Sequence, residues 1–565
     1  MQRALDALSL RGPDGEGQWW SKDGRIGLGH RRLSINDEHG GAQPLVSPEG
    51  FITCINGEFY GLDGAFHGET DSLALPEAYR SFGMIEGLRR LRGEFAFVFF
   101  DSASGRLYAG RDRFGIKPLV YARRGKELWL ASKPSALWAA GVEAGWSEKG
   151  FLQAAATQYP PARGSLFRGV QSVPPGHVLE IEGSRVELER YWSLPVQTGG
   201  PVVAEEFSER LRDCVWERVR TDHLTAVMLS GGVDSASILA LAAETGERLK
   251  AYTVDFPEAL GTTYSEAELA REQAVYSQVE HCLIPITRQD ILRGLSRAVQ
   301  DSQGLCVNGH LVAKWELARA IRADSAKVVL TGEGSDELLY GYRHFSPYFA
   351  TRTDSNVFDP AGTGILIDSH QLKVLPDNVP HFFHTKYELG RRLESLLAPE
   401  LQAEEAFRSI FPTSLSQAKM PPRQTARAAW LDTALRGYIL EVLGDGSEMA
   451  HSVEGRPPFL DHLLWERYSE PEDGGKSLLR EAVKGLVVEP IRSRPKHPFM
   501  ALPLGVPLLK QLTEQVAEVE HPFVSREKAL AQLKTLGRLS DEERLAWEPP
   551  MLWLLSSYYL QELWS

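Results

Sequence analysis

The chain has 565 residues, too many for one hydrophobic core, so we expect two or more domains. Its hydrophobic content of 43% and charged content of 24% are typical of globular proteins, and its net charge of -13 excludes broad binding to nucleic acids or anionic membranes. Four irregularly spaced cysteines predict neither a disulfide framework nor a zinc site. Without a signal-peptide pattern or a bilayer-spanning apolar run, we expect a cytoplasmic protein.

The first 192 residues contain short apolar or alternating runs separated by Gly, Asp and charged turns. Such runs predict β-strands, and their spacing predicts a β-sandwich with few helices. The segment YWSLPVQTGGPVV combines Pro and paired Gly with little periodicity, so we place a linker at 193–203. The runs predicted as strands are RIGLGHRRLSI, FITCINGEFY, GEFAFVFFD, RLYAGRD, LVYARR and ELWLAS.

From residue 204 the predicted strands and helices alternate. The apolar segments LTAVML, LKAYTVDF and AKVVLTG predict buried strands, and DSASILALAAETG and SEAELAREQAVYSQV predict helices between them. This alternation predicts a doubly wound parallel sheet of the α/β class. We expect a mixed, proline-dotted excursion over 345–435 and mostly helix after residue 436, all within one domain at 204–565.

The loop LSGGVDSA follows the first of these strands and opens a helix. Ligands of open α/β sheets bind beyond the carboxyl ends of the strands. Gly231 and Gly232 let backbone N–H groups approach an anion, and Ser230 and Ser235 add hydroxyl donors at the helix N-terminus. Asp234 is compatible with a bound phosphate when Mg²⁺ lies between them. We therefore favour a phosphate site over an ordinary glycine-rich turn.

A second loop, in VVLTGEGSDELLYGY, follows another buried strand and carries Gly332 and the carboxylates of Glu333, Asp336 and Glu337. Carboxylates this close repel one another unless a cation or a shared proton lies between them. Because both loops follow strands of the same sheet, they can face one crevice. The alternative is an acidic helix N-cap supplied by Ser335 or Asp336.

Four motifs occur in the order found in glutamine-dependent asparagine synthetases: SGGVDS, GEGSDELLYGY, EGRPPFLD and GKSLLREAV. The N-terminal half adds RGPDG, GLGHRRLSI, QPL, NGEFY and RDRFGIKPL. The chain therefore resembles this superfamily over nearly its whole length. The resemblance implies a class II glutamine amidotransferase-like domain at 1–192, with an N-terminal-nucleophile-hydrolase-like β-sandwich, and an ATP-pyrophosphatase domain at 204–565. It also implies ATP and Mg²⁺ as cofactors and cleavage of ATP to AMP and pyrophosphate.

The resemblance assigns roles in the synthetase half. It implies that Asp234 and Asp336 hold Mg²⁺, that Glu333 lies near the reacting carbonyl, and that Lys476 stabilises charge on the adenylating phosphate and the tetrahedral intermediate. Both steps build negative charge, so the chemistry needs a cation there. For Arg456 in EGRPPFLD we expect a structural role. The residues implied to bind ATP and pyrophosphate are Leu229, Ser230, Gly231, Gly232, Asp234, Ser235, Val254 and Gly332.

In the N-terminal half, the resemblance implies that Arg32 binds the carboxylate of glutamine. It assigns Asn56 and Gly57 to the oxyanion hole, and Glu58 and Asp71 to the amine end of glutamine. The nucleophile of that family is an N-terminal Cys whose own α-amine acts as base. This sequence starts Met, Gln, Arg, so we expect either a trimmed or misannotated start or a real loss of glutaminase activity.

Cys54 is a candidate replacement nucleophile, because strand alternation places it on the same face as Asn56. It lacks a free α-amine, however, and isolated cysteines usually pack as small apolar residues. We therefore expect Cys54 to be structural.

The segment CVNGHLVAKW departs from the stretch that helps bind aspartate in better-known asparagine synthetases. Asn308 and His310 either contact a different acceptor or cap the following helix. Three functions remain open: a ligase that joins ammonia, from glutamine or free, to a small-molecule carboxylate; an intramolecular cyclase of the β-lactam synthetase or lasso-peptide cyclase kind; and a non-catalytic nucleotide-binding homologue. By analogy with the family we expect a homodimer.

Overall fold

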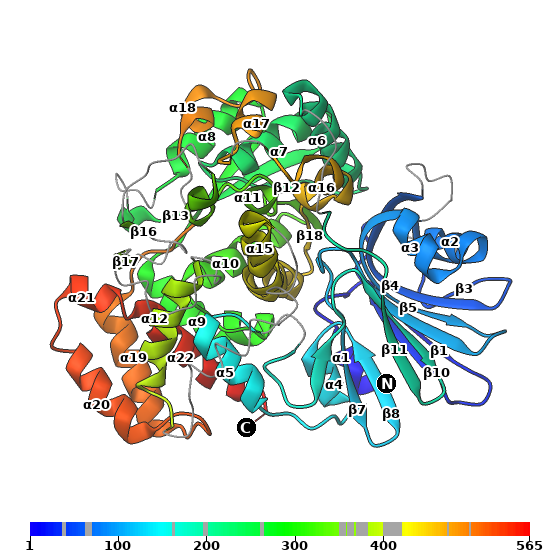
Figure 1. Cartoon of the computed structure of the whole chain (residues 1–565), viewed down its shortest axis with the longest axis horizontal. Helices are drawn as coiled ribbons and strands as arrows, with labels where there is room; N and C mark the ends of the chain where they lie inside the picture. Colours follow the sequence, from blue (N-terminus) through cyan, green and yellow to red (C-terminus); the bar gives the residue numbers. More distant parts are fainter. Residues whose placement is uncertain are drawn as a thin grey trace.

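The computed structural model describes residues 1–36, 41–62, 71–160, 164–195, 202–259, 265–349, 357–358, 367–368, 382–398, 421–471, 474–495 and 499–564. A β-rich N-terminal part precedes an α/β part that ends in a helical region (Figure 1). Within the expected linker, residues 196–201 lie outside the described residues, as does much of the excursion expected over 345–435.

Antiparallel sheets form the N-terminal part. One sheet has six strands in the order β11-β10-β6-β5-β4-β3, another has the order β8-β7-β9, and β1 pairs with β2. Each run predicted as a strand contains one. The strands are β1 (Gly15–Trp20), β2 (Gly27–Arg32), β3 (Leu45–Val46), β4 (Phe51–Leu62), β5 (Leu91–Asp101), β6 (Arg106–Arg111), β7 (Val120–Arg124), β8 (Glu127–Ala131), β9 (Val170–Ser172), β10 (His177–Glu182) and β11 (Arg185–Arg190).

Helices pack on the N-terminal sheets. Leu75 of α2 and Leu88 of α3 are buried with Phe95, Phe97 and Phe99 of β5, because alternate residues of that strand face the same layer. These helices therefore cover one face of the six-stranded sheet. The helices of this part are α1 (Gln2–Asp6), α2 (Ala74–Phe82), α3 (Met84–Arg90), α4 (Pro134–Ala139) and α5 (Glu148–Thr157).

Five parallel strands, in the order β14-β13-β12-β15-β18, form the centre of the α/β part. The chain runs outward from β12 to β14 and then returns to place β15 on the other side of β12. Ligands of doubly wound sheets bind where the strand order reverses in this way. Both predicted loops leave the sheet at this point, one after each central strand. The strands are β12 (Thr225–Met228), β13 (Leu249–Asp255), β14 (Glu280–Pro285), β15 (Val328–Leu330) and β18 (Glu454–Arg456).

Helices surround this sheet and form most of the C-terminal region (Figure 1). The first group is α6 (Ala204–Val219), α7 (Val233–Ala243), α8 (Ala267–Tyr276), α9 (Arg288–Ser302), α10 (His310–Ala323), α11 (Ser335–Leu338) and α12 (Phe382–Glu394). The second is α15 (Pro422–Trp430), the helical segment Leu431–Gly446, α16 (His462–Tyr468), α17 (Ser477–Ala482), α18 (Glu489–Ser493), α19 (Gly505–Glu518), α20 (Arg526–Leu536), α21 (Asp541–Leu545) and α22 (Glu548–Gln561). Among the described residues no helix is both long and apolar enough to cross a membrane.

The described residues after 436 are mostly helical, as predicted, and strand β18 is an element that the sequence did not predict. Its three residues pair in parallel with β15, and the Thr331 N–H donates to the Arg456 carbonyl oxygen at 3.2 Å. A three-residue strand with charged residues at both ends has no hydrophobic alternation, so sequence periodicity could not predict it. The strand brings Arg456 of EGRPPFLD next to the second loop.

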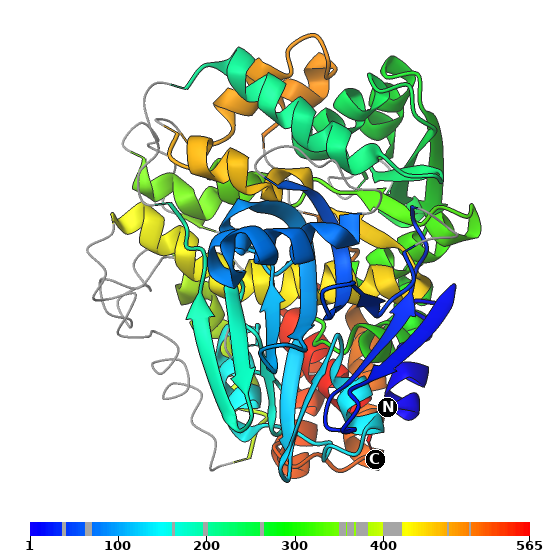
Figure 2. The ribbon, with the colours of Figure 1, turned by 90° about the vertical axis from the view of Figure 1, so that its right-hand side faces the viewer.

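Buried charges join the two parts. Arg218 of α6 forms ion pairs with Glu94 of β5 at 2.5 Å and with Asp461 at 3.0 Å. Arg92 of β5 adds a 2.7 Å pair to the same Asp461 carboxylate. In the side view the N-terminal strands lie in front of the C-terminal helices (Figure 2). Because each buried charge has a partner across the junction, the network holds the two parts in one arrangement.

Candidate active site

The first predicted loop forms a compact turn between β12 and α7. The Ser230 N–H donates to the Ser235 hydroxyl at 2.9 Å, and the Gly232 N–H donates to the Ser230 hydroxyl at 3.2 Å. Arg494 donates to the Gly231 carbonyl oxygen at 3.2 Å and to Glu266 at 2.7 Å. Arg494, which is not among the residues predicted from the sequence, approaches the loop from the segment after α18.

The second loop lies directly against the first. A Cβ atom on Gly332 would be 3.0 Å from the Ser235 backbone nitrogen and 3.0 Å from Asp234 Cβ, so a larger residue would push the two loops apart. The Ser335 hydroxyl, at the start of α11, donates to Asp234 at 2.7 Å. The two motifs, about a hundred residues apart in sequence, therefore form one edge of the site.

Lys476 lies between the two aspartates predicted to hold metal. Its Nζ is 2.5 Å from Asp234 Oδ2 and 2.5 Å from Asp336 Oδ1, and the lysine side chain is only 2% exposed. The residue has a φ of +68°, in the left-handed region that non-glycine residues seldom adopt. Backbone strain of this kind occurs at functional positions, where the surrounding structure maintains it.

The Asp234 and Asp336 carboxylates fit a divalent cation. Two of their oxygens lie no more than about 5 Å apart, because each is 2.5 Å from the same lysine nitrogen. Within the described part of the chain, no group of three or more His, Cys, Asp or Glu side chains is arranged to hold a metal ion. This donor set suits Mg²⁺, which commonly takes one or two carboxylates and completes its shell with phosphate oxygens and water.

Glu333 forms an ion pair that the sequence analysis missed. Lys314 Nζ, on α10, lies 2.8 Å from Glu333 Oε1. Burial acts to lower the pKa of Lys314, but the carboxylates of Glu333 and Glu448 outweigh it and raise that pKa. The signal was present in GHLVAKW, because His310 and Lys314 are four residues apart and share a helix face.

A cavity of about 270 Å³ is lined by residues of both loops and by Lys314. Asn308 and His310 also line it, but the Asn308 side-chain oxygen accepts from the backbone N–H groups of His310 and Ala501 at 3.1 and 3.0 Å. Gly231, Gly232 and Lys476 are outside the lining. The predicted residues that line the cavity are Leu229, Ser230, Asp234, Ser235, Val254, Gly332, Glu333 and Asp336.

A second cavity, of about 560 Å³, lies in the N-terminal part and is lined by Arg32, Asn56, Gly57 and Glu58. The Asn56 side-chain nitrogen is buried and has no hydrogen-bond partner among the described residues, as expected for a donor that awaits a ligand. The side chain of Asp71 lies outside the described residues.

Arg456 and Cys54 bear on two of the predictions for this second cavity, the role of Glu58 and the nucleophile. Arg456 Nη2 lies 2.8 Å from Glu58 Oε2, so a residue of the synthetase sheet holds the carboxylate predicted to contact the amine of glutamine. Cys54 does not line the cavity, and burial raises the pKa of its thiol to about 12. A thiol with that pKa is not a nucleophile at neutral pH.

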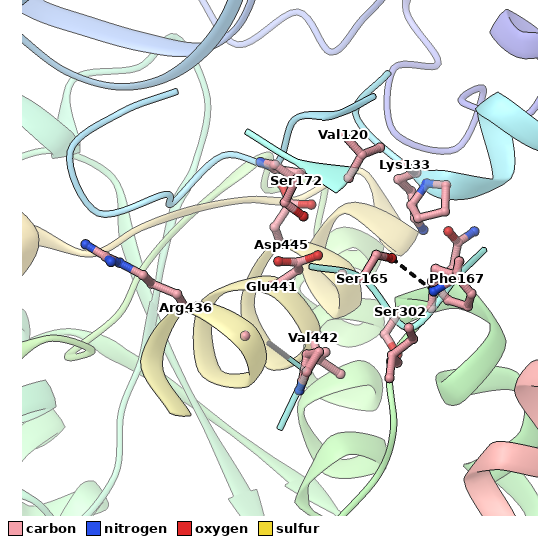
Figure 3. Close-up of a pocket in the computed structure, with 18 of the residues that line it drawn as sticks. Val120, Lys133, Ser165, Phe167, Ser172, Ser302, Arg436, Glu441, Val442 and Asp445 are labelled. Atoms are coloured by element: carbon pink, nitrogen blue, oxygen red, sulfur yellow. Dashed lines mark hydrogen bonds between the residues drawn. The ribbon is translucent and has the colours of Figure 1, made fainter. Parts of the chain in front are cut away.

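Smaller cavities lie between the two large ones. One, of about 50 Å³, shares Ser132 with the N-terminal cavity. In Figure 3, Glu441 and Asp445 project into it from the helical segment Leu431–Gly446, beside Ser172. Another, of about 20 Å³, shares Asp445 with the first and Glu333 with the synthetase cavity. Together, the smaller cavities therefore have lining residues in common with each of the two large ones.

The fold and site define a two-part protein: an antiparallel amidotransferase-like part joined to a parallel α/β part of the ATP-pyrophosphatase type. Comparison with known families gives the same division, because the asparagine synthase family matches residues 206–564 and the glutamine amidotransferase domain matches residues 1–192. The chain belongs to the asparagine synthase family. Membership supports an ATP-dependent amide-forming ligase, since enzymes of this family use ATP.

Proteins similar in sequence to this chain include both amidases and asparagine synthetases. Amidase chry2 of Gibberella zeae is 28% identical over 92% of this chain and 88% of its own length. Amidase chyE of Penicillium rubens is 28% identical over 88% and 84%. Asparagine synthetase [glutamine-hydrolyzing] 1 of Bacillus subtilis is 27% identical over 90% and 84%. The solved structure of an allosteric regulatory enzyme of purine biosynthesis aligns with 50% of this chain. Its TM-score of 0.27 is too low to support an argument about this fold.

Proposed function

We propose that this protein activates a small-molecule carboxylate as its acyl-adenylate and then forms an amide with ammonia. The observation that carries the proposal is the position of Lys476 between Asp234 and Asp336, beside the cavity formed by both loops. A buried cation and two carboxylates suited to Mg²⁺ at this edge of the sheet support the binding of a nucleoside triphosphate there.

Adenylation requires charge stabilisation at the α-phosphorus. A carboxylate oxygen of the acceptor attacks that phosphorus, the bond to the β-phosphate oxygen breaks, and pyrophosphate leaves. The Lys476 ammonium opposes the charge that builds on the phosphoryl oxygens, and the loop amides and hydroxyls hold the leaving pyrophosphate. Mg²⁺, held by Asp234 and Asp336, would neutralise phosphate charge when bound.

Amide formation requires a proton acceptor. Ammonia attacks the acyl carbon, the nitrogen loses a proton, and the bond to AMP breaks. Glu333 is placed for this role because it lines the cavity and its carboxylate is held by Lys314. The nearby Lys476 ammonium also balances the oxyanion of the tetrahedral intermediate.

The arrangement of cavities favours ammonia over an amine within the acceptor itself. The N-terminal cavity is lined by Arg32, Asn56, Gly57 and Glu58, and the two smaller cavities together share lining residues with it and with the synthetase cavity, which supports a route for ammonia toward Glu333. This route is needed only if nitrogen travels between the parts. An intramolecular cyclase would leave both the route and the unpartnered amide of Asn56 without a use.

The test is an assay of pyrophosphate, AMP and amide with ATP, Mg²⁺, a panel of carboxylic acids, and either ammonium or glutamine. We expect equal amounts of pyrophosphate, AMP and primary amide with ammonium. Products only from acids that carry their own amine would establish the cyclase instead. Absence of pyrophosphate release with every acid would contradict the proposed function.

A further inference from the structure

One wall of the synthetase cavity is built from aromatic side chains. The His310 ring stacks on Phe499 at 6.0 Å between centroids and lies 5.7 Å from the Tyr438 ring. Tyr438 is in turn 5.7 Å from Tyr159. All four rings line the cavity. Such a wall favours a flat, apolar ligand, because aromatic pairs gain energy beyond the area they bury.

The wall leads away from the proposed reaction centre. His310 lies one helical turn before Lys314, whose ammonium holds Glu333, and His310 Nε2 is 2.9 Å from the Tyr438 hydroxyl. An ion pair, one turn of α10, a hydrogen bond and a ring contact therefore link Glu333, Lys314, His310, Tyr438 and Tyr159 in that order. A ligand with its carboxyl group near Glu333 would place its body along these rings.

Hydrogen-bond donors lie at the far end of the wall. Gln158 is 1% exposed, lines the cavity, and its amide nitrogen has no partner among the described residues. Its amide oxygen accepts from Lys386, whose ammonium is 4.9 Å from the Tyr159 ring centroid. A buried amide donor without a partner costs free energy, which a ligand oxygen would recover.

The charges of the cavity do not suit aspartate. Its described lining contains no arginine, and the two lysines there, Lys314 and Lys386, contact Glu333 and Gln158. Burial lowers the pKa of His310 to about 4, so the imidazole is neutral at pH 7. An amino-acid acceptor would bury a second carboxylate and an ammonium, each of which needs an opposite charge.

We infer that the acceptor is an aromatic carboxylic acid with a hydrogen-bond-accepting oxygen at the end remote from the reacting carboxyl. The ring packs on Tyr438 and His310, and the remote oxygen accepts from Gln158. This inference rests on the proposed function, because it assigns the carboxylate that is adenylated.

The test compares phenylacetate, 4-acetamidophenylacetate and aspartate in two assays. One measures pyrophosphate release with ATP, Mg²⁺ and ammonium; the other measures binding of each acid by calorimetry in the presence of α,β-methylene-ATP. We expect kcat/KM to be higher for both aromatic acids than for aspartate. We expect kcat/KM for 4-acetamidophenylacetate to exceed that for phenylacetate by about tenfold, the ratio for one buried hydrogen bond. Gln158→Leu should lower kcat/KM for 4-acetamidophenylacetate to the value for phenylacetate and leave the value for phenylacetate unchanged. Tyr438→Leu should lower both kcat/KM and affinity for both aromatic acids.

Gln171→Leu, at an exposed position on β9, is the matched control and should leave all values unchanged. Unchanged affinity for the ATP analogue in each variant shows that the fold is retained. Preference for aspartate, or equal loss of both aromatic acids in Gln158→Leu, would overturn the inference while the proposed function stands. Binding of aromatic acids without pyrophosphate release from any acid would show that the cavity takes such acids but would contradict the proposed function, and with it their role as acceptor.

Discussion

Lys476 and Asp234 form a buried ion pair in which the lysine nitrogen lies 2.6 Å from one carboxylate oxygen and 2.5 Å from the other. Asp336 contacts the same nitrogen. The lysine ammonium therefore lies where a divalent cation shared by both aspartates would be bound. If Mg²⁺ binds these carboxylates as proposed, it competes with the lysine, which must then shift.

Lys476→Met should separate these two roles. We expect pyrophosphate release to fall by about 10²- to 10³-fold, the usual loss when one transition-state charge contact is removed. The Asp234 and Asp336 carboxylates lose their lysine partner, so Mg²⁺ without ATP should raise Tm more in this variant than in the wild type. Lys484→Met, at an exposed position with a surface ion pair, should change neither quantity. An equal Mg²⁺ response in wild type and Lys476→Met would contradict the competition.

The Glu333–Lys314 pair should behave as a unit in amide formation. We expect Glu333→Gln and Lys314→Met each to lower kcat by about 10²-fold, within the range for loss of one general base or of its positioning partner. The double variant should be no worse than either single one, because each change disables the same group. Rapid-quench assays should show normal formation of acyl-adenylate in Glu333→Gln. Additive losses would show that the two residues act separately.

Replacing Gly57 tests how closely the backbone packs at the proposed oxyanion hole. Its φ is +122°, and a Cβ atom would lie 1.9 Å from the Glu94 carbonyl oxygen. Gly57→Ala should therefore destabilise the protein by more than about 3 kcal/mol, beyond the ~1 kcal/mol cost of a left-handed alanine. Gly183→Ala, with a φ of +61° and no atom within 4 Å, should show the backbone cost alone. Denaturant unfolding of both variants measures the difference, and equal losses would refute the clash.

Glu448 should make stability depend on pH. Burial raises its pKa to about 7, against the opposing effects of Lys314 and Lys117, while Asp445 and Glu333 raise it further. The native state thus keeps a proton that the unfolded chain loses near pH 4.5, and stability falls as pH rises from about 4.5 to 7.

Glu448→Gln removes this titration. Its stability relative to wild type should rise over that pH interval by up to about 3 kcal/mol and then level off. The exposed Glu481→Gln should show no such trend. Chemical unfolding at several pH values measures this difference, and a flat difference between wild type and Glu448→Gln would contradict the raised pKa.

Local sequence signals predicted the parts of the fold that have strong periodicity. Strands such as β4 and β5, and the two loops after β12 and β15, follow directly from alternation and from glycine placed after buried runs. Strand β18 and the Arg456–Glu58 pair gave no such signal, because β18 pairs with β15, about 130 residues away in sequence, and Arg456 and Glu58 are 398 residues apart. The partners Lys314, Gln158 and Tyr438 come from separate elements, and only the folded chain brings them to one cavity.

The central claim, activation of a carboxylate by adenylation, is tested most directly with an acceptor whose carboxyl group carries ¹⁸O. The acid is converted to its amide with unlabelled ATP, Mg²⁺ and ammonium, and the nucleotide product is analysed by mass spectrometry. Attack of the carboxylate on the α-phosphorus predicts one ¹⁸O atom in each AMP and none in pyrophosphate. Unlabelled AMP, or ADP with labelled phosphate, would contradict the account.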